Sequence, residues 1–66
     1  MSDKLWFVYE NGSPVSVFED KQSAREFIED SMEEDPDSDY HLFRMPVDEI
    51  TDDSMEYDIA VEEGLL

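Results

Sequence analysis

Residues 4–18 read Lys-Leu-Trp-Phe-Val-Tyr-Glu-Asn-Gly-Ser-Pro-Val-Ser-Val-Phe, and this segment determines the type of fold that the chain can adopt. Aromatic and β-branched side chains dominate Lys4–Glu10, which favours a strand. Asn11 and Gly12 tolerate positive φ angles, so this pair indicates a tight turn. Pro14–Phe18 has the composition of a second strand, and a proline is tolerated at a strand start. The segment therefore predicts a β-hairpin.

A helix is predicted directly after the hairpin. Asp20 is a suitable N-cap, because its carboxylate can accept hydrogen bonds from N–H groups of the first helical turn. The apolar residues that follow fall at i, i+3, i+4 and i+8 and so share one helical face: Ala24, Phe27, Ile28 and Met32. Pro36 disfavours helical backbone at the residue before it, so the helix should end at or before Asp35.

The second half of the chain predicts further strands. Tyr40–Val47 is the third, with Pro46 typical of an edge or a bulge. Met55, Tyr57, Ile59 and Val61 then alternate with polar or small residues, which favours a fourth strand. The alternative is a helix that begins at Asp53, because Glu56 stands at capping-box spacing from it. We expect an α+β fold in one compact domain, residues 1–66: a small antiparallel sheet (strand–strand–helix–strand–strand) with one covering helix.

Composition excludes several classes of protein. The 66 residues include no Cys, so disulfide scaffolds and Cys-ligated zinc sites are impossible. No apolar run approaches the roughly 20 residues of a membrane span, and the first residues lack the pattern of a signal peptide. We therefore expect a cytoplasmic protein that does not bind membranes.

The residues offer little for catalysis or cofactor binding. The only histidine, His41, lies within a predicted strand, and two glycines provide no phosphate-binding loop. Asp35–Asp39 resembles the start of an EF-hand loop, but Tyr40 and Pro46 replace the glycine and glutamate that this loop requires. We expect no enzyme activity, no cofactor and no dedicated metal site.

Charge is the strongest signal in the sequence. Four basic residues and twenty acidic ones give a net charge of −16, of which residues 29–66 carry −14. Fourteen of the fifteen acids of this half lie in or beside two clusters: Glu29, Asp30, Glu33, Glu34, Asp35, Asp37 and Asp39 in the first, and Asp48, Glu49, Asp52, Asp53, Glu56 and Asp58 in the second, with Glu62 beside it. The first cluster opposes the helix dipole and contains like-charge i,i+4 pairs, both of which destabilise a helix. A local cost without a structural gain is typical of a functional surface.

A compact carboxylate array suits a protein that imitates DNA. DNA carries one charge per about 1.7 Å of its axis, and the proteins that grip it supply lysine and arginine. Acids at i,i+4 on a helix or i,i+2 on a strand recur every roughly 5–7 Å, a spacing suited to a phosphate-binding surface. Glu29, Asp30, Glu33 and Glu34 offer the helical version; Glu56, Asp58 and Glu62 offer the strand version. We expect all fourteen clustered acids to contact a basic partner, and direct nucleic-acid binding is disfavoured by repulsion.

The chain also resembles the small acidic proteins that phages make early in infection to take over the host. The resemblance rests on the opening Lys-Leu-Trp-Phe-Val-Tyr-Glu-Asn-Gly, on Val-Phe-Glu-Asp-Lys-Gln-Ser-Ala-Arg-Glu-Phe at residues 17–27, and on the acidic remainder. Some of these proteins are DNA mimics that block a nucleoid protein such as HU, uracil-DNA glycosylase, a restriction enzyme or RNA polymerase. The resemblance implies an inhibitor of a host DNA-binding protein, acting in the host cytoplasm.

Two other functions remain open from the sequence. An adaptor or antitoxin-like protein would use its acids to cover a basic partner that does not bind DNA, and a divalent-cation buffer would use them to bind metal. We also expect a homodimer, because a thin core, an exposed strand edge and the apolar residues Leu65 and Leu66 favour self-association.

Overall fold

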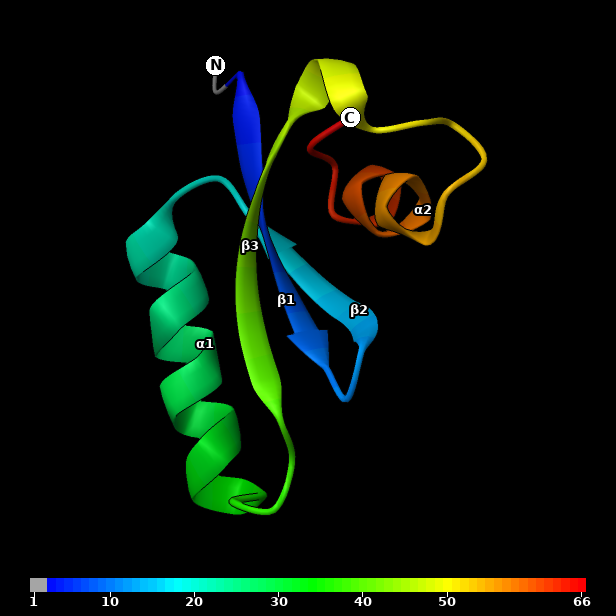
Figure 1. Ribbon diagram of the computed structural model, residues 1–66. Coiled ribbons are helices and arrows are strands. Elements are labelled where there is room, and N and C mark those ends of the chain that lie inside the picture. The colour runs from blue at the N-terminus through cyan, green and yellow to red at the C-terminus, as the bar shows by residue number, and fades with distance from the viewer. Residues whose placement is uncertain (1–2) are drawn as a thin grey trace.

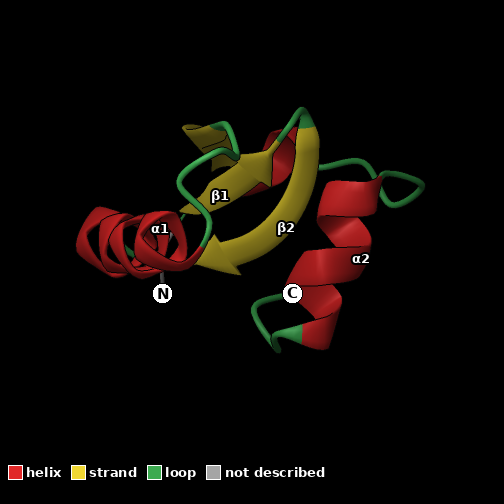
Figure 2. Ribbon diagram, turned by 90° about the horizontal axis from the view of Figure 1, so that it is seen from below, coloured by secondary structure: helices red, strands yellow, loops and turns green. Residues whose placement is uncertain are grey.

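The computed structural model describes residues 3–66 and contains three strands and two α-helices in this part of the chain (Figure 1). In chain order the elements are β1 (Lys4–Glu10), β2 (Ser13–Phe18), α1 (Lys21–Glu34), β3 (Tyr40–Pro46), a single 3-10 turn (Val47–Glu49) and α2 (Met55–Glu62). The sheet lies between the helices, with α1 on one face and α2 on the other (Figures 1 and 2). The predicted α+β class with an antiparallel sheet is confirmed.

The strand order is β2-β1-β3, and both pairings are antiparallel. The predicted hairpin is confirmed: Asn11 and Gly12 form its turn with φ angles of 53° and 88°. The β1–β2 register shifts between Val8 and Tyr9, which marks a bulge in β2. The β1–β3 ladder is regular over its whole length. Because β1 pairs with both other strands, it is the central strand.

The main core lies between the sheet and α2. Leu5, Phe7 and Val17 are buried there against Ala60 of α2, and both Phe7 and Ala60 are 0% exposed. Half-buried Leu65 packs against the same group. Fully burying a side chain such as Phe7 stabilises the fold by roughly 1.5–3 kcal/mol. The core is small, in keeping with the length of the chain.

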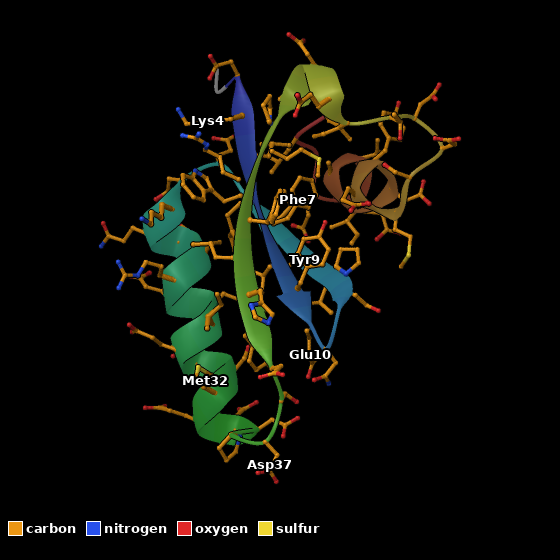
Figure 3. All side chains as sticks on the ribbon, in the orientation of Figure 1. Lys4, Phe7, Tyr9, Glu10, Met32 and Asp37 are labelled. Carbon is orange, nitrogen blue, oxygen red and sulfur yellow. The ribbon has the colours of Figure 1, made fainter. Side chains whose placement is uncertain are left out.

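Helix α1 covers the opposite face of the sheet. Asp20 is its N-cap, as predicted, and its carboxylate accepts the Ser23 N–H at 3.3 Å. Ala24 is buried, and the rings of Phe27 and Phe18 lie 5.5 Å apart between centroids. Met32 was expected on the buried face but is 48% exposed, because the last turns of α1 extend beyond the ends of the strands (Figures 1 and 3).

The predicted fourth strand is wrong, and so is the single covering helix. Residues 55–62 form α2, capped by Ser54 rather than Asp53: the Ser54 hydroxyl accepts the Tyr57 N–H at 3.2 Å. Gly64, with φ of 79°, ends the helix in a Schellman motif, in which the Leu65 N–H donates to the Ala60 carbonyl. A capped helix satisfies its own backbone and buries Ala60 on the second apolar face of the sheet, which a strand at the edge would leave uncovered.

Candidate functional site

The first acidic cluster forms one surface at the end of α1, here called the α1 acidic surface. Its residues are Glu29, Asp30, Glu33, Glu34, Asp35, Asp37 and Asp39, and all seven are exposed. The end of α1 projects past the sheet, with Asp37 of the following loop at the tip of the molecule (Figure 3). These carboxylates are thus accessible to a partner.

Hydrogen bonds hold both ends of the loop that completes the α1 acidic surface. Asp35 caps the helix with its N–H on the Ser31 carbonyl, and its carboxylate accepts the Ser38 hydroxyl at 2.7 Å. Asp39 exchanges two hydrogen bonds with the hairpin turn: Asn11 N–H donates to the Asp39 carbonyl at 2.8 Å, and Asp39 N–H donates to Asn11 Oδ1 at 3.1 Å. The array is therefore held in place by the hairpin.

Replacing Asn11 with glycine should loosen this loop selectively. Glycine accepts the positive φ of position 11 and keeps the backbone bond to Asp39, but it removes the Oδ1 acceptor. We expect the Asp39 amide to exchange with deuterium several-fold faster, while amides of β1 and β3 are unchanged. Equal acceleration throughout the sheet would show that the effect is global unfolding instead.

The second acidic cluster lies across the sheet from the first. This α2 acidic surface comprises Asp48, Glu49, Asp52, Asp53, Glu56, Asp58 and Glu62, from the 3-10 turn, the following loop and α2. All except Glu56 are exposed. Because α1 and α2 cover opposite faces of the sheet (Figure 2), the fold does not unite the two clusters in one continuous surface.

Glu56 was expected to bind a partner, but its carboxylate has a structural contact. Half-buried, it accepts a hydrogen bond of 2.5 Å from the Tyr9 hydroxyl, which joins α2 to the central strand. The strand spacing expected for Glu56, Asp58 and Glu62 is also wrong. On a helix, Glu56 and Asp58 point in different directions, whereas Asp58 and Glu62 form an i,i+4 pair.

Two further exposed acids belong to these surfaces and were not among the expected contact residues. Glu26 lies three and four residues before Glu29 and Asp30 on α1, and Glu63 is the C-cap of α2. Helical spacing alone identifies Glu26. Glu63 can be assigned to the α2 acidic surface only because the last segment is a helix, with Glu63 as its C-cap.

Burial, together with the hydrogen bond to Glu56 and the negative charge of Glu56, raises the pKa of Tyr9 to about 12. Tyr40 on β3 has a similar arrangement, since its hydroxyl donates to Glu10 at 3.2 Å. Its pKa is also raised, by burial and then by the charge of Glu10. Both phenols therefore favour their neutral forms in the folded state.

These shifts predict how stability depends on alkaline pH. A neutral Tyr9 stabilises the fold fully below the unfolded pKa of about 10, and this contribution is lost as pH rises towards 12. Tyr9→Phe should lower the free energy of unfolding by about 1–3 kcal/mol at pH 7, because it leaves the Glu56 carboxylate without its donor. Urea unfolding should show that the difference in the free energy of unfolding between wild type and variant becomes smaller above pH 10. A constant difference up to pH 12 would contradict this assignment.

No group of three or more potential ligands within residues 3–66 is arranged to hold a metal ion. In the same part of the chain, none of the helices combines the length and the apolar character needed to cross a membrane. Comparison with models of known families, with curated proteins and with solved structures gave no match.

Proposed function

We propose that this protein is a DNA-mimic inhibitor. It occupies the DNA-binding surface of a basic host protein, either a nucleoid-associated protein such as HU or a DNA-processing enzyme, and excludes DNA by competition. The proposed setting is the cytoplasm of the host cell. The protein's role is binding rather than catalysis.

The observation that carries this proposal is the density of charge. The longest dimension of the fold is 32 Å, so a net charge of −16 corresponds to about one negative charge per 2 Å. Duplex DNA carries one per about 1.7 Å, and 32 Å is close to the roughly 34 Å of one DNA turn. A basic surface that accommodates one turn of DNA would meet a similar charge on this protein.

Preorganisation supports the same function. Six of the seven carboxylates in the α1 acidic surface belong to residues that the fold holds in place. Four of these residues lie on α1, Asp35 is the C-cap and is hydrogen-bonded to Ser38, and Asp39 is hydrogen-bonded to Asn11. A flexible acidic peptide would lose conformational entropy when it bound, whereas this array has already lost it on folding. The fold accordingly stabilises a charge arrangement that is unfavourable for the isolated helix.

The α1 acidic surface is the proposed contact face. Its carboxylates project from the end of the molecule and are all exposed, whereas the α2 acidic surface uses Glu56 to secure the core. Lysines at the end of α1 would be better for helix stability, since they would complement the helix dipole. The acids there are therefore best explained by binding.

The test is displacement of a fluorescent DNA duplex from purified HU and from a panel of other DNA-binding proteins. We expect competition at low salt that weakens steeply between 50 and 300 mM salt, because association releases counterions. An unstructured acidic peptide of equal net charge is the control and should compete less well. If the protein displaces DNA from none of the panel at 50 mM salt, the proposal fails. Tight capture of a partner that does not bind DNA would then favour the adaptor, and stoichiometric calcium binding the cation buffer.

A further inference from the structure

The outer edge of β3 is a strand edge whose backbone groups have no partner strand within residues 3–66, because β3 pairs only with β1. In Figure 1 this edge faces the viewer, with α1 and α2 on either side and no other described segment in front of it. Such an edge is a template for pairing with another strand. The free backbone groups and the charge of this edge indicate which kind of strand can pair with it.

Two hydrogen bonds establish which backbone groups of β3 are free. Val47 N–H donates to the Asp3 carbonyl at 3.0 Å, and Asn11 N–H donates to the Asp39 carbonyl at 2.8 Å, one at each end of the β1–β3 ladder. Bonded pairs alternate with non-bonded pairs in an antiparallel ladder, so odd-numbered residues of β3 face β1. The even-numbered residues direct their backbone groups outwards: Tyr40, Leu42, Arg44 and Pro46.

The same edge is the least acidic part of the second half of the chain. Residues 40–47 contain no Asp or Glu, although fifteen acids occur in residues 29–66, and they include His41 and Arg44. This edge therefore does not attract a basic strand, and it repels a second copy less than the acidic surfaces would. Phe43, on the face that α2 covers only in part, is 57% exposed beside the Tyr9 ring.

We propose that β3 pairs with β3 of a second copy, antiparallel, with Phe43 on the twofold axis. In this register Leu42 N–H meets the Arg44 carbonyl of the second copy, Arg44 N–H meets the Leu42 carbonyl, and Tyr40 N–H meets the Pro46 carbonyl. Every free N–H group of the edge gains an acceptor, and Pro46, which has no N–H, lies at the end where none is needed. The two Phe43 side chains become direct neighbours in a non-bonded pair, where side chains approach most closely.

The dimer joins two sheets into one, with both α1 helices on one face and both α2 helices on the other. This inference concerns self-association and does not require that the protein inhibits a DNA-binding protein. Its salt dependence has the opposite sign: salt screens repulsion between two chains of charge −16 and strengthens the dimer, whereas it weakens binding to a basic partner.

Cysteine crosslinking tests the register directly, because the chain has no cysteine of its own. Residues that face each other in a non-bonded pair have Cα atoms about 4.5 Å apart, which is within the range that a disulfide spans. Under mild oxidation Phe43→Cys should form a linked dimer at least tenfold faster than Leu42→Cys, whose two copies are offset in this register. Equal rates, or faster linkage at position 42, would overturn the register.

Sedimentation tests the dimer itself. Wild type should self-associate at micromolar concentration, more tightly at 300 mM than at 50 mM salt. Arg44→Pro removes an outward N–H without breaking a bond to β1 and should weaken dimerisation at least tenfold, whereas Arg44→Ala should not; circular dichroism verifies that both variants fold. A monomer at every salt concentration would refute the dimer. Loss of binding to a basic partner in Arg44→Pro, with wild type monomeric, would assign the edge to that partner instead.

Discussion

Replacing Glu29, Glu33 and Glu34 together by lysine is expected to abolish displacement of DNA from the target protein. Each exposed ion pair contributes at most about 1 kcal/mol. Reversing three charges converts three attractions into three repulsions, so affinity should fall by about 3–6 kcal/mol, which is at least about a hundredfold. A single neutralisation such as Asp37→Asn should have little effect. The DNA-displacement assay at 50 mM salt measures both.

The matched control reverses three exposed acids of the α2 acidic surface, Asp53, Asp58 and Glu62. It changes the net charge by the same amount and spares Glu56, whose replacement would break the bond to Tyr9. We expect this control to retain most of the inhibition. If both variants lose activity equally, net charge alone explains binding; if only the control loses it, the contact face is the α2 acidic surface.

The α1 triple variant should also remain folded, which makes its loss of function interpretable. Lysine near the end of α1 complements the helix dipole, and the pairs that Asp30 forms with positions 33 and 34 change from repulsion to attraction, while positions 29 and 33 remain a like-charge pair of the opposite sign. Its melting temperature should equal or exceed that of wild type. A clear decrease would mean that the acids have a structural role that the contacts do not reveal.

Phe7→Ala is expected to unfold most of the protein. Phe7 is fully buried on the central strand, and truncating such a side chain typically costs about 3–5 kcal/mol. A domain of this length has a total stability of roughly 3–10 kcal/mol. Loss of the cooperative thermal transition, followed by circular dichroism, measures the effect.

Phe43→Ala is the control for Phe7→Ala, because it makes the same chemical change on the same face of the sheet. Phe43 is 57% exposed, so its truncation should cost less than about 1 kcal/mol in dilute, monomeric protein. A similar loss of stability in both variants would show that the core is not organised around Phe7.

Local signals in the sequence were sufficient for the hairpin, for α1 and for β3. The Asn11–Gly12 pair, the Asp20 cap and the helical spacing of Ala24, Phe27 and Ile28 act within a few residues of one another. Each of these features has the position in the structure that its chemistry predicts. Elements defined by such short-range interactions are the ones that sequence reasoning recovers.

The last segment shows why the rest was not recovered. Alternation of apolar residues from Met55 to Val61 fits a strand, yet Met55 is 59% exposed and the buried residue is Ala60. The missing information was the uncovered second face of the sheet. The continuous apolar run Leu5–Tyr9 indicates a strand buried on both faces, and this requires a second covering element besides α1.

Exposure of the acidic residues was predictable, but their relation in space was not. Composition alone places most carboxylates at the surface. That the clusters lie on opposite sides of the sheet, and that Glu56 binds Tyr9 across 47 residues of sequence, depends on tertiary packing. The sequence therefore predicted that these carboxylates would be exposed, but not that they would form two separate surfaces.

The bulge in β2 limits what the opposite edge of the sheet can do. The register shift near Val8 and Tyr9 and the missing N–H of Pro14 interrupt the row of outward-directed backbone groups along the edge of β2. Helix α2 also contacts β2. Growth of the sheet by addition of further copies would need two competent edges, and only the edge at β3 is regular. Assembly should therefore stop at a closed pair, and this chain should resist forming fibrils even when it is highly concentrated.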